Sequence, residues 1–96
     1  MYELLQTRAE IRFLDMPNGR KTPFRSGYRP LFNFTDVGTK ISGRIDLIEQ
    51  ETFSVGMKGV VNITFIKGMI DDIHFKTGVK FTFDEGTEIF GEGVFL

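Results

Sequence analysis

Few side chains in this 96-residue sequence could do chemistry, and they are not grouped as a reaction would need. The chain has no Cys and a single His, His74, which excludes disulfides, thiolate ligands, Cys nucleophiles and any site with two imidazoles. Asp71 and Asp72 lie close to His74, but in an extended strand only Asp72 and His74 share a face. Two ligands are too few for a divalent cation, so we predict no metal site.

The carboxylates of Asp84 and Glu85 are the remaining acid–base candidates. Each could meet another acid across a folded domain, but the sequence supplies no accompanying base, nucleophile or metal ligand. We therefore predict no catalytic residues and no enzymatic activity.

The segment 38–45 is a near match to a phosphate-binding loop. Arg44 and Ile45 stand where such a loop needs Lys followed by Ser or Thr. The segment also continues into a predicted strand, whereas a phosphate loop needs the N-terminus of a helix. We expect neither a bound nucleotide nor any other cofactor.

The segment 19–30 concentrates positive charge and contains no acid. Its four basic residues accompany two prolines and two aromatic residues: Arg20, Lys21, Arg25 and Arg29; Pro23 and Pro30; Phe24 and Tyr28. The prolines predict a long, stiff loop outside any regular ladder. Two interpretations stay open: a surface that contacts phosphates or a protein partner, or a structural crossover whose aromatic rings cap the domain and whose arginines bond loop carbonyls.

Alternation of polar and apolar residues predicts strands along most of the chain. The expected strands are 8–13, 31–34, 41–47, 61–65, a hairpin of 71–76 and 79–84 around Thr77-Gly78, and 88–96. No segment has the apolar spacing of a helix. Six or seven short strands with glycine-marked turns predict an all-β fold, a small closed antiparallel Greek-key β-barrel in which residues 1–96 form one domain.

Composition limits the partners and the cellular location that we expect. The sequence is 41% hydrophobic and 26% charged, with a formal net charge of −1, so no overall field attracts nucleic acid or a membrane surface. No apolar run approaches the roughly 18–20 residues of a membrane span, and the first residues lack the pattern of a signal peptide. We expect a cytoplasmic protein without membrane contact.

The segment 19–30 and its neighbours carry a family resemblance. GRKTPF at 19–24, GYRP at 27–30 and FNF at 32–34 resemble the signature of the third, C-terminal domain of translation elongation factor Tu. The similarity extends to AEI at 9–11, SGRIDL at 42–47, the strand at 61–67, and the closing hairpin with KFTFDEG at 80–86 and GEGV at 91–94. It implies the same small antiparallel barrel.

The resemblance also implies binding surfaces. In the factor, this domain contacts the T-stem backbone of aminoacyl-tRNA and faces the GTPase domain and the exchange factor. By position, the tRNA-contacting residues correspond to Arg20, Lys67, Glu85 and Gly86, and Ser42 stands where the family has Thr. Because the resemblance covers the third domain alone, it implies no GTP hydrolysis.

Two functions follow as expectations. The first is a non-catalytic binding module that docks a protein partner of the translation apparatus through the 20–30 loop, with Arg25, Tyr28 and Arg29, and through the 69–78 hairpin. The alternative is weak, salt-sensitive binding of tRNA or another structured RNA backbone through Arg20, Lys67 and Gly86.

Overall fold

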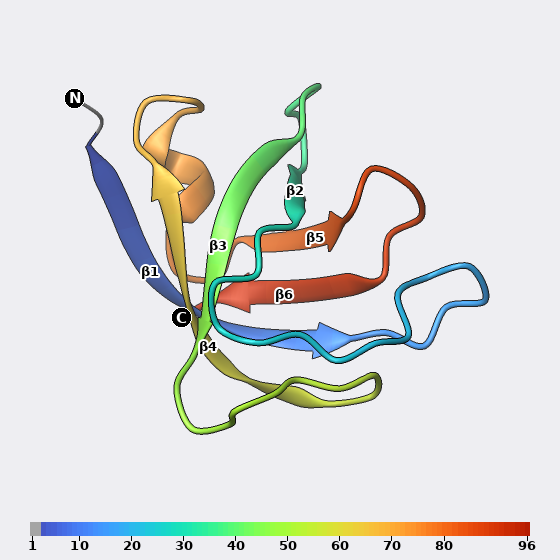
Figure 1. Cartoon of the computed structure of the whole chain (residues 1–96). Helices are drawn as coiled ribbons and strands as arrows, with labels where there is room; N and C mark the ends of the chain where they lie inside the picture. Colours follow the sequence, from blue (N-terminus) through green and yellow to red (C-terminus); the bar gives the residue numbers. More distant parts are fainter. Residues whose placement is uncertain (1–2) are drawn as a thin grey trace.

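The computed structural model describes residues 3–96 and forms a closed barrel of six antiparallel strands. The strands are β1 (Leu4–Phe13), β2 (Leu31–Phe34), β3 (Ile41–Leu47), β4 (Lys58–Ile66), β5 (Lys80–Asp84) and β6 (Gly91–Phe95). Their order around the barrel is β1-β4-β3-β2-β5-β6 (Figure 1). The consecutive strands β2, β3 and β4 are neighbours in the sheet, and β1 lies beside β4 although a long connection separates it from β2. This arrangement is a Greek key. The predicted all-β barrel is confirmed, with six strands.

Phenylalanine fills the interior. All eleven Phe side chains are buried, and their rings contact one another in a continuous cluster; the centroids of Phe32 and Phe65, for example, lie 5.0 Å apart. The alternation seen in the sequence places the Phe rings of the strands inward, because successive side chains of a strand point to opposite faces; Phe24, Phe53, Phe75 and Phe90 come from the connections between strands. The abundance of Phe is therefore explained by the barrel core.

Glycines make room for these rings. A Cβ on Gly91 would lie 2.0 Å from the Phe83 ring, and one on Gly43 would lie 2.7 Å from the rings of Phe32 and Phe65. Both glycines face inward on strands, so the missing side chain is replaced by an aromatic ring from the neighbouring strand. Because a ring occupies the space that a side chain at each glycine would need, the barrel can close at a small diameter.

The predicted strand at 71–76 is wrong, and with it the 69–78 hairpin. Residues Asp72–Phe75 form a short 3₁₀ helix, η1, whose N-cap Asp71 accepts a hydrogen bond from the Ile73 N–H at 3.1 Å. Phe75 is buried in the core, so the chain turns inward here to close one end of the barrel with an aromatic ring. This tertiary contact outweighs the weak local alternation.

Other differences concern the ends of strands. β1 begins four residues earlier than predicted, β4 begins three residues earlier, and the last strand begins at Gly91 instead of 88.

Nowhere in residues 3–96 is a helix long and apolar enough to cross a membrane.

Gly91→Ala tests whether the Phe83 ring needs the space that Gly91 leaves free. The added methyl group would overlap the Phe83 ring, and we expect the free energy of unfolding to fall by about 1–3 kcal/mol, as for overpacked cores. Urea denaturation measures the change. Gly38→Ala is the control, because no atom lies within 4 Å of a Cβ built there. Equal stability of the two variants would contradict the packing argument.

Candidate functional site

The 19–30 segment folds back against the barrel. Phe24 exchanges backbone hydrogen bonds with Phe53, at 3.0 and 2.8 Å, and the Ile45 N–H donates to the Tyr28 carbonyl at 2.7 Å. The Phe24 and Tyr28 rings stack with centroids 4.4 Å apart, and Phe24 is 2% exposed. The aromatic rings of this segment thus belong to the barrel wall, as the crossover interpretation predicted.

Arg20 anchors this segment to the β5–β6 turn. Its Nε donates to the Thr22 carbonyl at 2.8 Å, one terminal nitrogen donates to the Pro23 carbonyl at 3.2 Å, and the other pairs with Glu85 at 2.9 Å. The guanidinium also lies over the Tyr28 ring, 4.8 Å from its centroid. Because its charge is paired and three of its five N–H groups are engaged, Arg20 has little left to offer a phosphate.

Tyr28 completes this anchor. Burial raises the pKa of its phenol well above the ordinary value, and the Glu85 carboxylate raises it further. The hydroxyl oxygen is buried without a hydrogen-bond partner within residues 3–96. Tyr28 therefore stays neutral, and because it is half-buried beside Phe24, only part of its ring is open to a partner.

Arg25 and Arg29 are exposed cations of the segment that differ from the exposed Lys21, which pairs with Asp15. Neither forms an ion pair with any of the residues 3–96. Arg29 borders a shallow hollow of about 90 Å³ together with Ser42 and Arg44. Arg44 is paired with Asp46 at 2.9 Å, so Arg29 supplies the unneutralised charge at this hollow.

Lys67 lies near the opposite end of β1 from Arg20. It directly follows β4, and its N–H donates to the Glu3 carbonyl, just before the start of β1. Arg20 follows the end of β1. The Lys67 amino group lies 3.9 Å from the carboxylates of both Glu3 and Asp72. The structure therefore does not bring the predicted RNA-contacting residues together, and acids flank this lysine.

Gly86 is also occupied. It has φ of +94°, which only glycine adopts without strain, and its N–H donates to the Asp84 carboxylate at 2.7 Å. Because this donor is already used within the fold, a contact of the Gly86 backbone with RNA would have to use another group or break this bond. Glu85 is likewise engaged by Arg20.

Asp84 forms a buried polar cluster that the sequence did not reveal. Its side chain is 0% exposed, and one carboxylate oxygen accepts from Lys40 Nζ at 2.7 Å and from Asn33 Nδ2 at 2.9 Å. Burial alone would raise the pKa of Asp84, but the hydrogen bonds from Lys40, Asn33 and Gly86 outweigh it and hold the pKa below the ordinary value. This acid has cationic and amide partners, not the second acid that acid–base chemistry would need.

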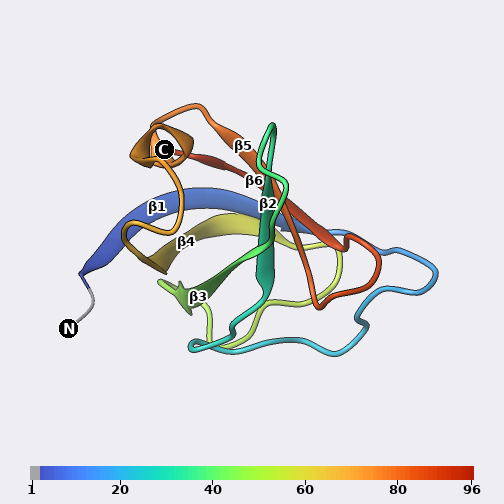
Figure 2. The ribbon, with the colours of Figure 1, turned by 90° about the horizontal axis from the view of Figure 1, so that it is seen from above.

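One end of the barrel gathers exposed apolar side chains. Five of the eight large hydrophobic residues exposed within residues 3–96 lie where β1 begins and where β4 and β6 end; they are Leu4, Ile66, Met69, Ile73 and Leu96. Figure 2 shows the connection from β4 to β5, with η1, at this end, and the last part of that connection bonds to β6, where the Gly78 N–H donates to the Phe95 carbonyl at 2.8 Å. We call these five residues and the 67–78 connection the apolar end. The sequence analysis predicted a contact surface at 69–78. It did not predict that exposed apolar side chains gather at this end.

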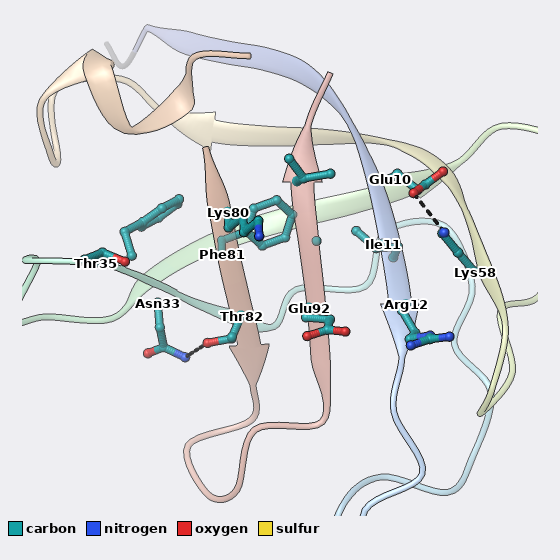
Figure 3. A pocket seen from close by; sticks show the side chains of 13 residues that line it. Glu10, Ile11, Arg12, Asn33, Thr35, Lys58, Lys80, Phe81, Thr82 and Glu92 are labelled. Carbon is teal, nitrogen blue, oxygen red and sulfur yellow. Dashed lines mark hydrogen bonds and ion pairs between the residues drawn. The ribbon is translucent and has the colours of Figure 1, made fainter. Parts of the chain in front are cut away.

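A second, larger hollow lies on the outer face of β1, β6, β5 and β2. It has a volume of about 630 Å³, and its charged lining contains both signs (Figure 3): Arg12, Lys58 and Lys80 with Glu10 and Glu92. Lys58 pairs with Glu10 at 3.4 Å. Because three cations face two carboxylates, this surface lacks the strong positive field that a nucleic-acid backbone requires.

The acidic residues and the histidine at η1 have separate neighbours. Asp71 caps η1, Asp72 faces Lys67, and His74 lies against Phe34 with ring centroids 6.0 Å apart. Within residues 3–96 no three His, Cys, Asp or Glu residues are placed to hold a metal ion.

No protein-family model matches this chain. The resemblance to the third domain of elongation factor Tu therefore stays a prediction from the sequence motifs, while the barrel itself is established by the structure.

Lys40→Met tests the buried cluster and its pH dependence. Because the pKa of Asp84 is lower in the folded than in the unfolded chain, its ionised form stabilises the fold above about pH 3.8, and this contribution is lost as the pH falls through the folded pKa. We expect Lys40→Met to cost about 1–2 kcal/mol at neutral pH and less at about pH 3. Urea unfolding at both pH values measures the difference.

Lys21→Met is the matched control, since Lys21 pairs with Asp15 while both side chains are exposed. Exposed pairs contribute less than about 1 kcal/mol. A cost for Lys40→Met that is the same at both pH values would argue against the role assigned to the Asp84 carboxylate.

Proposed function

We propose that this protein is a non-catalytic module that docks a protein partner through its apolar end. The observation that carries the proposal is the concentration of five exposed large hydrophobic side chains at one end of a barrel whose own core is fully packed. Such side chains gathered on a small domain are typical of protein–protein contact surfaces.

The exposed side chains of the connection that carries η1 support docking of a protein. Met69 is 61% exposed and Ile73 is 54% exposed, and both belong to the connection that carries η1. Phe75 anchors that connection in the core, so the backbone that carries these exposed side chains is positioned by the fold. Pre-positioned apolar anchors lose little conformational entropy on binding, which favours affinity.

Charged residues around this end would contribute specificity. Lys67 and Asp72 carry opposite charges beside the apolar side chains, and Arg29 is exposed at the hollow that Leu4 and Ile66 also line. Charges at the rim of an interface select partners and steer association more than they add affinity. Arg25, elsewhere on the 20–30 loop, also forms no ion pair within residues 3–96 and is available to a partner.

The resemblance to elongation factor Tu supports a partner from the translation apparatus. In that family the third domain faces the GTPase domain and the exchange factor, so those surfaces are the first partners to test. A cytoplasmic location fits this proposal.

Binding of tRNA or another structured RNA is the second candidate, and the hollow beside Arg29, Ser42 and Arg44 favours it. A guanidinium and a hydroxyl beside each other can contact a phosphate. The net charge of −1 and the acids around Lys67 oppose it. We therefore rank RNA below a protein partner.

Variants that change charge or polarity distinguish docking of a protein partner from binding of RNA. We expect the double variant Met69→Asp, Ile73→Asp to lose binding to the protein partner by about 2 kcal/mol or more, because two apolar contacts would be replaced by unpaired charges. Purified elongation-factor GTPase domain, exchange factor and bulk tRNA serve as probes, with binding measured by calorimetry or fluorescence polarisation at two salt concentrations.

The control variant is Ile48→Asp, because Ile48 is 41% exposed near the other end of the barrel. If Ile48→Asp weakens binding as much as the double variant does, the apolar end is not the contact face. Retention of tRNA that falls after Arg29→Glu, with a reduced salt slope, would favour the RNA alternative.

A further inference from the structure

Strand β1 is longer than the strand on one side of it, and this leaves a backbone edge without a neighbour. β1 pairs with β4 from Leu4 to Arg12, whereas β6 pairs only with the part from Ala9 to Phe13. One further bond, from the Leu96 N–H to the Arg8 carbonyl, ends the β6 side. Within residues 3–96, the segment 4–7 therefore has a strand neighbour on the β4 side alone.

The backbone groups that face this edge can be assigned. The Lys67 N–H donates to the Glu3 carbonyl at 2.8 Å, so odd-numbered residues of β1 bond toward β4. The Arg8 carbonyl accepts its bond from the β6 side at 3.0 Å, so even-numbered residues bond toward β6. Since this direction alternates along an antiparallel strand, the N–H and C=O groups of Leu4 and Gln6 point into the open edge.

The side chains of this edge do not protect it. Proteins usually guard an exposed strand edge with Lys, Pro, a bulge or a covering loop. The segment 4–7 reads Leu-Leu-Gln-Thr and has neither a charge nor a proline. Its register with β4 is continuous, without a bulge. Leu4 is 66% exposed and Gln6 is exposed, so no other segment of residues 3–96 buries these two residues of the edge.

We propose that the segment 4–7 of β1 accepts an added strand from a protein partner, an extended segment with alternating apolar side chains. This deepens the proposed function and rests on it, because Leu4 and Leu96 of the apolar end flank the same edge. The added strand would continue the line of β6 and bond to the N–H and C=O groups of Leu4 and Gln6. Main-chain bonds supply affinity in this mode, and alternate side chains supply specificity.

The uncharged edge and its apolar flanks select the chemistry of the occupant. A partner strand with apolar side chains on one face would pack against Leu4 and Leu96, while its other face stayed polar. A nucleic acid cannot form the paired main-chain bonds that Leu4 and Gln6 offer. The occupant is therefore a polypeptide in extended conformation.

Gln6→Pro tests the proposal without breaking the barrel ladder. Proline removes the N–H that faces the open edge, whereas the bonds to β4 belong to the odd-numbered residues on either side. Gln6→Ala is the matched control, since it keeps the N–H and loses the side chain. The probe is a displayed library of linear peptides of about ten residues, the length of a long strand, selected on the wild-type protein.

The proposal expects enriched peptides with alternating apolar residues. We expect their affinity to fall about tenfold or more in Gln6→Pro and to be nearly unchanged in Gln6→Ala. Amide hydrogen exchange gives a second readout that does not depend on the variant. In the free protein the amides of Leu4 and Gln6 should exchange faster than those of Leu5 and Thr7, and peptide should protect them.

Three outcomes would overturn the proposal: no enriched peptide, peptides that bind Gln6→Pro as tightly as the wild type, or peptides that leave the Leu4 and Gln6 amides unprotected. Self-association of the wild type in sedimentation equilibrium that Gln6→Pro abolishes would also overturn it, because the occupant would then be a second copy. If Met69→Asp, Ile73→Asp loses its protein partner while Gln6→Pro keeps it, the docking face stands and the added strand fails.

Discussion

The packing of aromatic rings inside a narrow closed sheet is the constraint on which the rest of this structure depends. Six strands enclose a small interior, and all eleven Phe side chains occupy it or close its ends. Rings of this size fit only because Gly43 and Gly91 have no side chains facing them. Because aromatic rings fill the core, the binding proposals rest on the outer surface and the ends of the barrel.

Much of the charge in the chain serves to hold loops on that core. Arg20 joins the 19–30 segment to Glu85, and Lys40 with Asn33 satisfies the buried carboxylate of Asp84. These groups are poor candidates for partner contacts, because moving them would leave a buried charge or carbonyl without a partner. Arg25 and Arg29 are not used in this way and stay available at the surface.

The two ends of the barrel therefore differ in what they offer. The end with the 14–22 loop and the 85–90 turn, both on the right in Figure 1, is tied together by the ion pair of Arg20 with Glu85. The other end exposes apolar side chains around η1, and there the first residues of β1 have a strand neighbour within residues 3–96 on the β4 side alone. Exposed apolar surface and an unguarded strand edge at one place favour contact with another polypeptide over contact with RNA.

The sequence by itself determined the fold class and the inward faces, because a period of two in Phe, Ile and Val is enough to state which side of each strand is buried. It could also limit the chemistry, since one His and no Cys permit few sites. Only the tertiary structure decided that 72–75 is a 3₁₀ helix, that Arg20 and Gly86 are already engaged, and that residues 4–7, within the described chain, have a strand neighbour on the β4 side alone. Each of these depends on contacts between segments far apart in the chain, such as Arg20 with Glu85, and local pattern carries no information about which distant groups meet.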